Sequence, residues 1–452
     1  MVAEERTVSK SRAPRANAVR ARIDGAEGYP IGADGGRAGR TVAAVPVDAL
    51  VCDAAQRQGL VCTRSLGRAG LAVGLLESQA DAPAFHSRWC ASADHVPDCA
   101  VTPLEFVEAV VARAQHQRAR VLFALHDGSI DAIREHRSEV ERHVALALAD
   151  EAALEIAVAK ERTLALAAEL GLGVPASIAA EGESDVRAAA HELGFPLVVK
   201  PSVSWVQRER GGRRLACALA ANLGEALRAV EALAQVGGAP ILQEWLVGSR
   251  EAVSLFRAEG RIWARFAQVA HRMQPPLGGA SVVRESIPLP ADVTDAAERL
   301  VDACGLDGYS EVEFRRDAHG RPRLMEINPR LSASVEIAVR AGVDFPLLLY
   351  RWAAGDELQP SRGFRAGIRM RWLGGDIRWL RSTLASQGRP EADPAPRAIA
   401  SFCSAFLRPS SYDYVDVHDF RPALAATASW ALRAARRVAP NRPLGQSTQR
   451  SS

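Results

Sequence analysis

The sequence predicts a multidomain protein of mixed α/β and α+β class. Two observations carry this expectation. Strands and helices alternate through residues 41–150, and residues 310–330 show the period-2 pattern of two consecutive antiparallel strands. A length of 452 residues gives room for two or three domains. We place the segment boundaries at 1–40, 41–150, 151–358 and 359–452.

The composition excludes several classes of protein. A hydrophobic content of 48% with 24% charged residues is ordinary for a soluble globular chain. The net charge of +3 is spread over 56 basic and 53 acidic residues, so it gives no reason to expect nucleic acid as a partner. The chain has no long apolar run that predicts a membrane span or a signal peptide. The seven cysteines form no CxxC pair, so we expect reduced thiols and a cytoplasmic protein.

The first two segments differ in character. Residues 1–40 are rich in Arg, Ala and Gly without a hydrophobic period, which predicts a disordered basic tail. Residues 41–150 predict a small parallel sheet, with strands at 45–52, 70–76 and 121–125 and helices at 54–66 and 102–117. His126 and Asp127 close the last of these strands at its carboxyl end, where open α/β sheets bind ligands. A helix N-cap with a neighbouring His explains the same residues equally well.

Two lysines stand out in the next segment. An Ala/Leu/Glu-rich stretch predicts one helix over 151–170 that contains Lys160 and ends at Gly171. The apolar strand 195–201 then ends at Lys200, and a lysine at the end of a buried strand needs an anionic partner. A polar loop with two adjacent glycines follows. Residues 240–256 predict two short strands around a Gly-Ser turn.

The segment 310–330 gathers carboxylates on one strand pair. With a two-residue turn at His319 and Gly320, Glu313 lies directly opposite Glu326. Facing like charges destabilise a sheet, and a divalent cation removes this conflict, because carboxylates and the Asn328 amide oxygen are hard oxygen ligands suited to Mg²⁺. The alternative is a solvated sheet face whose acids are neutralised by neighbouring arginines, namely Arg315, Arg316 and Arg323.

The strand carrying Glu313, followed by Glu326, Asn328, Pro329 and Arg330 in a Glu-x-Asn-Pro-Arg motif, resembles the metal-binding hairpin of the ATP-grasp superfamily. Within it, the chain most resembles the carbamoyl-phosphate-synthase-like group of carboxylate–amine ligases. The resemblance implies an ATP-grasp fold preceded by a pre-ATP-grasp α/β domain and followed by a small C-terminal domain with a basic helix.

The resemblance also implies roles for individual residues. The implied metal ligands are Glu313, Glu326 and Asn328, the implied nucleotide contacts are Lys160, Lys200, Glu244, Trp245, Leu246 and Glu251, and the implied catalytic residues are Lys200 and Arg330. Among the nucleotide contacts, residues 244–246 would face the adenine ring and Glu251 would bind the ribose hydroxyls.

The implied activity is ATP-dependent activation of a carboxylate as an acyl-phosphate, which an amine then attacks with release of ADP and phosphate. ATP and Mg²⁺, or Mn²⁺ in its place, would be required, and the chain could form a homodimer. Bicarbonate phosphorylation and transfer to a non-amine acceptor would use the same machinery. A catalytically silent ATP-binding regulatory or assembly subunit is the alternative from another class. The motifs name neither the carboxylate nor the amine.

Overall fold

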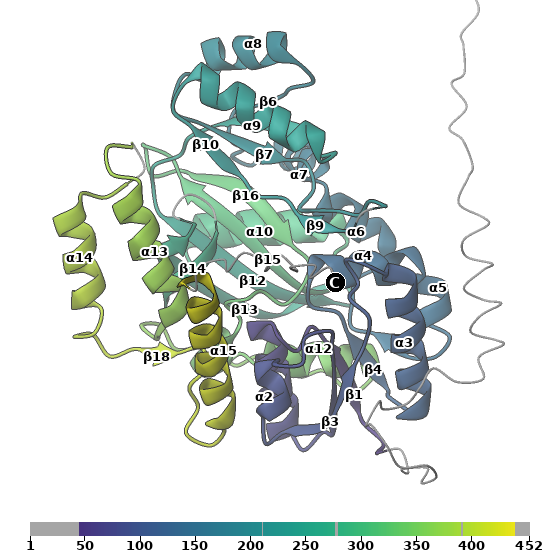
Figure 1. Ribbon diagram of the computed structural model, residues 1–452. Coiled ribbons are helices and arrows are strands. Elements are labelled where there is room, and N and C mark those ends of the chain that lie inside the picture. Colours follow the sequence, from purple (N-terminus) through teal and green to yellow (C-terminus); the bar gives the residue numbers. More distant parts are fainter. Residues whose placement is uncertain (1–44, 210, 276–278, 390–391, 439–452) are drawn as a thin grey trace, which may run out of the picture.

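The computed structural model describes residues 45–209, 211–275, 279–389 and 392–438. The predicted tail, residues 1–40, lies outside the described residues. Figure 1 shows the elements in three groups, each built on a β-sheet. The mixed α/β class expected from the sequence is confirmed.

The first group is a five-stranded parallel sheet with the strand order β3-β2-β1-β4-β5. Its strands are β1 (Ala49–Cys52), β2 (Val73–Glu77), β3 (Cys90–His95), β4 (Val121–Phe123) and β5 (Ala145–Leu146). Its helices are α2 (Arg57–Arg68), η1 (Pro83–His86), α3 (Pro103–His116), α4 (Asp127–Glu135) and α5 (Arg137–Val140). The sequence predicted the parallel sheet but missed two of its strands, β3, a partly exposed edge strand without large apolar residues, and the two-residue strand β5.

The second group is a four-stranded antiparallel sheet covered by two helices, drawn in teal in Figure 1. Its strands are β6 (Ser177–Ala179), β7 (Leu197–Pro201), β10 (Ala218–Ala220) and β11 (Pro240–Glu244), and its helices are α8 (Glu183–Leu193) and α9 (Leu223–Gln235). These elements enclose a hydrophobic core of their own, which includes Val186, Val199 and Leu242. The separate core makes this group a compact lobe above the larger sheet.

The third group is a seven-stranded sheet that contains the carboxylate hairpin at one edge. Its order is β16-β15-β12-β13-β14-β17-β18, with β12 (Arg250–Ala258), β13 (Arg261–Gln274), β14 (Ala280–Ser286), β15 (Gly308–Arg316), β16 (Pro322–Asn328), β17 (Arg369–Arg371) and β18 (Ser411–Tyr412). The remaining helices are α6 (Glu151–Val158), α7 (Lys160–Glu169), α10 (Ala291–Cys304), α11 (Glu336–Ala341), α12 (Phe345–Ala354), α13 (Leu373–Ala385), α14 (Ala395–Ser404) and α15 (Arg421–Val438). A small two-stranded sheet of β8 (Trp205–Val206) and β9 (Arg213–Arg214) lies apart.

The five-stranded and seven-stranded sheets share their hydrophobic cores. One core cluster contains Leu122 of the first sheet with Phe314 of the other, and a second contains Phe123 with Phe266. Because both clusters extend across the two groups, the first sheet is fixed against the sheet that bears the carboxylates.

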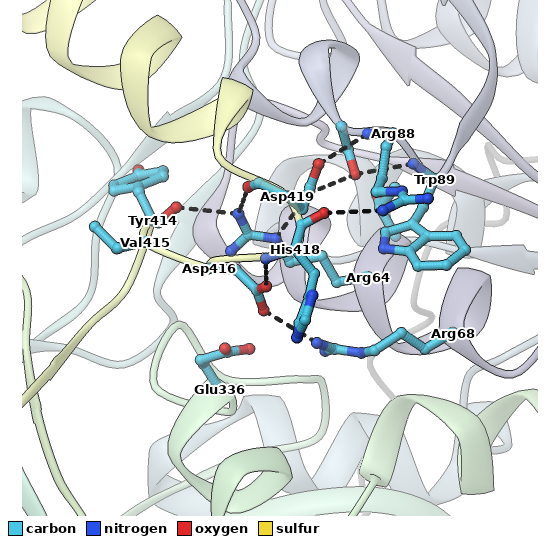
Figure 2. A network of polar contacts seen from close by, with 12 residues as sticks. Arg64, Arg68, Arg88, Trp89, Glu336, Tyr414, Val415, Asp416, His418 and Asp419 are labelled. Carbon is cyan, nitrogen blue, oxygen red and sulfur yellow. Dashed lines mark hydrogen bonds and ion pairs between the residues drawn. The ribbon is translucent and has the colours of Figure 1, made fainter.

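The C-terminal segment strengthens this attachment with buried ion pairs (Figure 2). The fully buried Arg64 of α2 donates to a carboxylate oxygen of Asp419 at 2.9 Å and to the Tyr414 carbonyl at 3.0 Å. Asp413 accepts hydrogen bonds from both Arg57 and Arg284. Residues 359–452, predicted as a small C-terminal domain, thus contribute β17 and β18 to the large sheet and hold α2 against it.

The predicted single helix over 151–170 is wrong. The chain breaks at Ala159 (φ −93°, ψ 105°) between α6 and α7, which makes Lys160 the first residue of α7. The Thr163 hydroxyl donates to the Ile156 carbonyl at 2.7 Å, and the Lys160 backbone N–H donates to the Ser202 carbonyl at 3.0 Å. These contacts with neighbouring segments compensate for lost helical hydrogen bonds, so tertiary structure overrides the helix propensity of the Ala-rich stretch.

In the part of the chain that the structure describes, none of the helices combines the length and the apolar character needed to cross a membrane.

Candidate active site

The carboxylate hairpin has the register that the sequence predicts. Glu313 of β15 pairs with Glu326 of β16, and Glu311 pairs with Asn328. Cross-strand partners share a face of the sheet, so all four side chains lie on the same side. Glu313 is buried, with 5% of its surface exposed, which excludes the solvated face that was the alternative.

The predicted two-residue turn is wrong, although the register is correct. The strands are joined by a five-residue loop, residues 317–321, in which Gly320 has φ +76°. Phe314 pairs with Leu324 and Glu313 pairs with Glu326, so Met325 has no partner on β15 and forms a β-bulge. The longer loop and the extra residue in β16 offset each other, so the two glutamates still meet.

Glu313 has a cationic neighbour that the sequence interpretation missed. Arg250, the first residue of β12, donates through Nε to Glu313 Oε2 at 2.8 Å and is ion-paired with it. Burial raises the pKa of Glu313 to about 7, because this effect, together with the charge of Glu326, outweighs the opposing charge of Arg250. The cluster therefore holds two carboxylates of unequal acidity.

Glu326 lies among positive charges from three different elements. Burial acts to raise its pKa, but the charges of Lys160, Arg250 and Lys200 outweigh burial and lower it. Lys200, at the end of β7, is buried, and burial lowers its own pKa. Lys160 is also buried, and its ammonium donates to the Ser204 hydroxyl at 3.0 Å. The structure thus brings both predicted lysines to the predicted metal pair.

Lysine is otherwise almost absent from this chain. Of 56 basic residues only three are lysines, Lys10, Lys160 and Lys200. Lys10 lies outside the described residues, so both lysines of the described part of the chain lie beside Glu326. A compact ammonium binds phosphate as a point charge, whereas guanidinium forms a planar fork. The rarity of lysine in this arginine-rich chain is visible in the sequence alone, and it could have marked Lys160 and Lys200 as candidate phosphate ligands.

The donor set at the hairpin fits a hard divalent cation. Asn328 Nδ2 lies 3.3 Å from Glu313 Oε1 and 3.4 Å from Glu326 Oε1, so the amide and both carboxylates converge on one point. The amide carries an oxygen as well as a nitrogen and can act as a third oxygen donor. The described residues contain no group of three or more His, Cys, Asp and Glu side chains that could hold a metal ion.

Residues 244–246 link the four-stranded and seven-stranded sheets. The sequence pattern suggested that β11 and β12 form a hairpin, but they lie in different sheets and do not pair. Glu244 Oε1 accepts from the Ala176 N–H at 2.9 Å. The Leu246 carbonyl accepts from Arg315 Nη1 at 2.9 Å, and the Arg315 guanidinium lies 4.9 Å from the ring centroid of Trp245. The predicted adenine-contacting segment is therefore the hinge between two lobes.

Glu251 is not brought to this cluster. It pairs with Phe314, while its neighbour Ala252 pairs with Glu313, so Glu251 lies on the opposite face of the sheet. Both carboxylate oxygens of Glu251 accept from Arg316, each at 2.8 Å. The residue of β12 that shares the face of Glu313 and contacts it is Arg250.

This placement gives an expected result for Glu251→Ala. We expect the affinities for ATP and for 2′,3′-dideoxy-ATP to fall equally or not at all. The free energy of unfolding should fall by about 1–3 kcal/mol because Arg316 loses a buried acceptor. Titration of both nucleotides, with thermal unfolding, measures these quantities. A loss specific to ATP would instead restore the ribose role expected from the sequence.

Arg330, just beyond β16, forms an ion pair with the first group of elements. Its Nε donates to Asp127 Oδ1 at 2.6 Å, across 203 residues of sequence. Burial acts to raise the pKa of Asp127, but the charge of Arg330 and its hydrogen bond lower it to about 2. His126 takes the N-cap position of α4, accepting from the Gly128 N–H at 3.3 Å. The helix N-cap interpretation of the strand end is therefore confirmed, with His126 as the capping residue, and ligand binding at this strand end stays a prediction.

A cavity of about 230 Å³ opens beside the hairpin between α4, α6, α7 and the end of β16. The charged and polar side chains in its wall include Asp127, Lys160, Trp205, Glu326, Asn328 and Arg330. Lys200, Glu313, Glu251 and residues 244–246 are not part of the wall. The structure thus joins four of the predicted site residues around one cavity.

The polar loop after Lys200, described over residues 202–209 and 211–215, contributes Val203, Ser204 and Trp205 to the same cavity. It contains the short strands β8 and β9, which pair through Trp205 and Arg214. The Gly212 N–H donates to the Ala100 carbonyl at 2.6 Å, and the Trp205 ring lies edge-on to His126 with centroids 5.5 Å apart. The loop therefore contacts the first group of elements across the cavity.

Comparison with known proteins agrees with this geometry. Residues 241–375 match the family described as ATP-grasp in the biosynthetic pathway with Ter operon. D-alanine–D-alanine ligase B of Pseudomonas putida is 26% identical over 208 residues, covering 43% of this chain and 63% of that protein. The chain belongs to the ATP-grasp superfamily. It spans less than two thirds of the length of this curated relative.

Solved ATP-grasp structures share the fold at low identity. Biotin carboxylase from Campylobacter jejuni, in complex with β,γ-ATP, superposes with a TM-score of 0.59 and 15% identity, covering 72% of this chain and 74% of that one. An L-amino acid ligase from Bacillus licheniformis gives a TM-score of 0.53 and 16% identity, covering 69% and 74%. These likenesses show the ATP-grasp fold.

Proposed function

We propose that this ATP-grasp protein is a ligase that activates a carboxylate as an acyl-phosphate for attack by an amine, releasing ADP and phosphate. The observation that supports it most is the buried pair Glu313–Glu326 with Asn328, placed beside two lysines, with Glu326 and Asn328 in the wall of a cavity. D-alanine–D-alanine ligase and the L-amino acid ligase are named for reactions of this type.

The nucleotide is proposed to lie between the four-stranded and seven-stranded sheets. Its base would contact the hinge at Glu244, Trp245 and Leu246, and its phosphates would contact Lys160 and Lys200. Two buried ammonium groups lie next to the single carboxylate of Glu326, so positive charge is in excess there. Phosphate oxygens would supply the negative charge that balances it.

A divalent cation, Mg²⁺ or Mn²⁺, would be held by Glu313, Glu326 and Asn328. When bound, it supplies positive charge to phosphate oxygens, as hard oxygen donors allow. The pairing of Arg250 with Glu313 Oε2 leaves Glu313 Oε1 turned toward the Asn328 amide group, which Glu326 Oε1 also faces.

The chemistry needs no protein nucleophile. A carboxylate oxygen attacks the γ-phosphorus, the bond to the bridging oxygen breaks, and ADP leaves. The neutral amine then attacks the acyl carbon, phosphate leaves with the oxygen that bridged carbon and phosphorus, and the amine releases one proton to solvent. Lys160, Lys200 and Arg330 offset the charge that develops, so this site works by positioning and electrostatic stabilisation. The substrates are a small-molecule carboxylate and an amine, and a homodimer stays a prediction.

A silent regulatory subunit is the second candidate, and a specific observation weighs against it. Like charges facing each other across a strand pair are unfavourable, and Arg250 with the two lysines offsets this cost in the metal-free protein. A protein without turnover has no chemical use for two carboxylates and an amide that converge on one point.

The proposal is tested by the products of nucleotide turnover. With Mg²⁺, pooled carboxylic acids and pooled amines, we expect ADP and orthophosphate to appear only when both pools are present. Chromatography of the nucleotides together with a phosphate assay measures this. Formation of AMP would contradict the proposed site of attack, and tight ATP binding without turnover on any pair would favour the regulatory subunit.

A further inference from the structure

Arg250 contacts the carboxylate hairpin directly, and the proposed chemistry gives this residue no role. Its side chain is 17% exposed. It donates through Nε to Glu313 Oε2 at 2.8 Å, and its Nη2 is ion-paired with the same oxygen. Two of the three guanidinium nitrogens therefore bind a single oxygen of Glu313.

The third nitrogen of Arg250 fixes the guanidinium to neighbouring strands. Nη1 donates to the Gly279 carbonyl at 2.8 Å and to Met273 Sδ at 3.0 Å. Met273 lies near the end of β13 and Gly279 just before β14, where the pairing of these two strands is irregular. A planar guanidinium presents its donors in a rigid fork. Arg250 can therefore turn away from Glu313 only if it also loses its contacts with Gly279 and Met273.

The second oxygen of Glu313 points toward the other proposed metal ligands. Glu313 Oε1 lies 3.3 Å from Asn328 Nδ2, and Glu326 Oε1 lies 3.4 Å from the same nitrogen. Because Arg250 occupies Oε2, Glu313 presents one oxygen at the point where the three side chains converge. Glu313 is thus held as a one-oxygen ligand, whereas an unrestrained carboxylate can bind a cation through both of its oxygens.

The number of oxygens that a carboxylate offers discriminates between divalent cations. Ca²⁺ takes about six to eight oxygen ligands at about 2.3–2.6 Å, and carboxylates often bind it through both oxygens. Mg²⁺ requires near-octahedral geometry at about 2.0–2.1 Å and is usually bound by one or two carboxylates together with waters and phosphate oxygens. A hairpin in which Glu313 offers one oxygen therefore suits the smaller ion and gives Ca²⁺ fewer ligands than it prefers.

We propose that Arg250 is a positioning residue that limits Glu313 to one donor oxygen and thereby makes the hairpin selective for Mg²⁺ and Mn²⁺ over Ca²⁺. This inference rests on the metal site of the proposed function and assigns a specificity role to a residue outside the three ligands. Removing Arg250 has two separable effects. Loss of its positive charge strengthens the binding of every divalent cation, whereas the oxygen that it frees on Glu313 favours Ca²⁺ in particular.

Competition between Mn²⁺ and Ca²⁺ for the whole, nucleotide-free protein tests the proposal, with Mn²⁺ as the spectroscopic probe for Mg²⁺. Electron paramagnetic resonance measures free Mn²⁺ while Ca²⁺ is added, and the Mn²⁺ that Glu326→Gln still binds is subtracted as background. In Arg250→Met, we expect the ratio of the Kd for Ca²⁺ to the Kd for Mn²⁺ to fall about tenfold, which is the usual size of an effect from a residue that orients a metal ligand.

The matched control is Lys160→Met, which removes another cation beside Glu326, one whose ammonium donates to Ser204 and not to Glu313. It should strengthen the binding of both ions by similar factors and leave the ratio unchanged. If Arg250→Met does not fold, Arg250→Lys provides the second variant. An ammonium keeps the charge without the planar fork, so the ratio should fall by a smaller factor.

Three results would overturn the inference. The first is a wild-type ratio in both Arg250 variants. The second is a fall of the ratio in Lys160→Met as large as that in Arg250→Met, because charge alone would then explain it. The third is a wild-type protein that binds no more Mn²⁺ than Glu326→Gln does.

Nucleotide turnover separates this inference from the proposed function. Mg²⁺-dependent release of ADP with an acid and an amine, together with an unchanged cation ratio in Arg250→Met, would leave the ligase function standing and reject the role of Arg250. Release of AMP together with a lowered ratio would reject the ligase mechanism and support the role of Arg250 in cation selection.

Discussion

Replacing Glu326 with Gln is expected to lower the rate of ADP release by a factor on the order of 10³ or more, because it removes a proposed metal ligand without changing volume. Glu326 is the carboxylate of the pair that is influenced by the charges of Lys160 and Lys200 as well as by that of Arg250. We therefore also expect a lower melting temperature of the metal-free protein, because three buried cations lose a counter-charge. Steady-state turnover and thermal unfolding measure the two effects.

The matched control for this variant is Glu298→Gln. Glu298 is ion-paired with Arg265 and lies outside the cavity wall, so its loss should leave turnover unchanged. Near-normal activity of Glu326→Gln would remove the metal assignment, whatever its effect on stability.

Lys200→Met is expected to raise the KM for ATP, or lower kcat/KM, by a factor on the order of 10². The change keeps the apolar stem and removes the ammonium from a fully buried position at the end of β7. Lys200→Arg should not restore activity, although the charge returns, because a planar guanidinium is larger than an ammonium and residue 200 is buried. Kinetics with varied ATP, together with titration of a nonhydrolysable analogue, distinguish binding from turnover.

The arginine variant makes this prediction specific to lysine. The chain uses Arg for nearly all of its basic positions, so an Arg at residue 200 would be the ordinary choice if charge alone were sufficient. Full activity of Lys200→Arg would show that the site requires only a positive charge at residue 200 and not a lysine. A normal kcat/KM for ATP in Lys200→Met would remove Lys200 from the nucleotide site altogether.

Local sequence patterns predicted the elements with strong periodicity and clear ends. The sequence pattern of residues 291–304 and that of residues 345–354 each predict a helix, and the structure has both helices with these bounds. Each has an apolar stripe and ends at a glycine in the left-handed region. The meeting of Glu313 and Glu326 was also predictable, since hairpin partners are close in sequence. The break at Ala159 was not, because only contacts with a distant segment favour it.

The face of a strand could not be predicted without its pairing. Glu251 and Arg250 are neighbours on β12, and which of them faces the carboxylate pair depends on the register with β15. A shift of one residue exchanges the two faces, and nothing in residues 240–256 fixes that register. The Asp127–Arg330 pair joins segments 203 residues apart, so only the packing of the first sheet on the hairpin reveals it.

Transfer of oxygen from the substrate carboxylate to phosphate tests the central claim most directly. In an acyl-phosphate mechanism, one carboxylate oxygen bridges carbon and phosphorus and leaves with the phosphate. With a carboxylate substrate labelled with ¹⁸O in both oxygens, mass spectrometry should find one ¹⁸O in each phosphate released during amide formation, and ADP as the nucleotide product. Unlabelled phosphate during productive ligation, or label in AMP, would contradict the account.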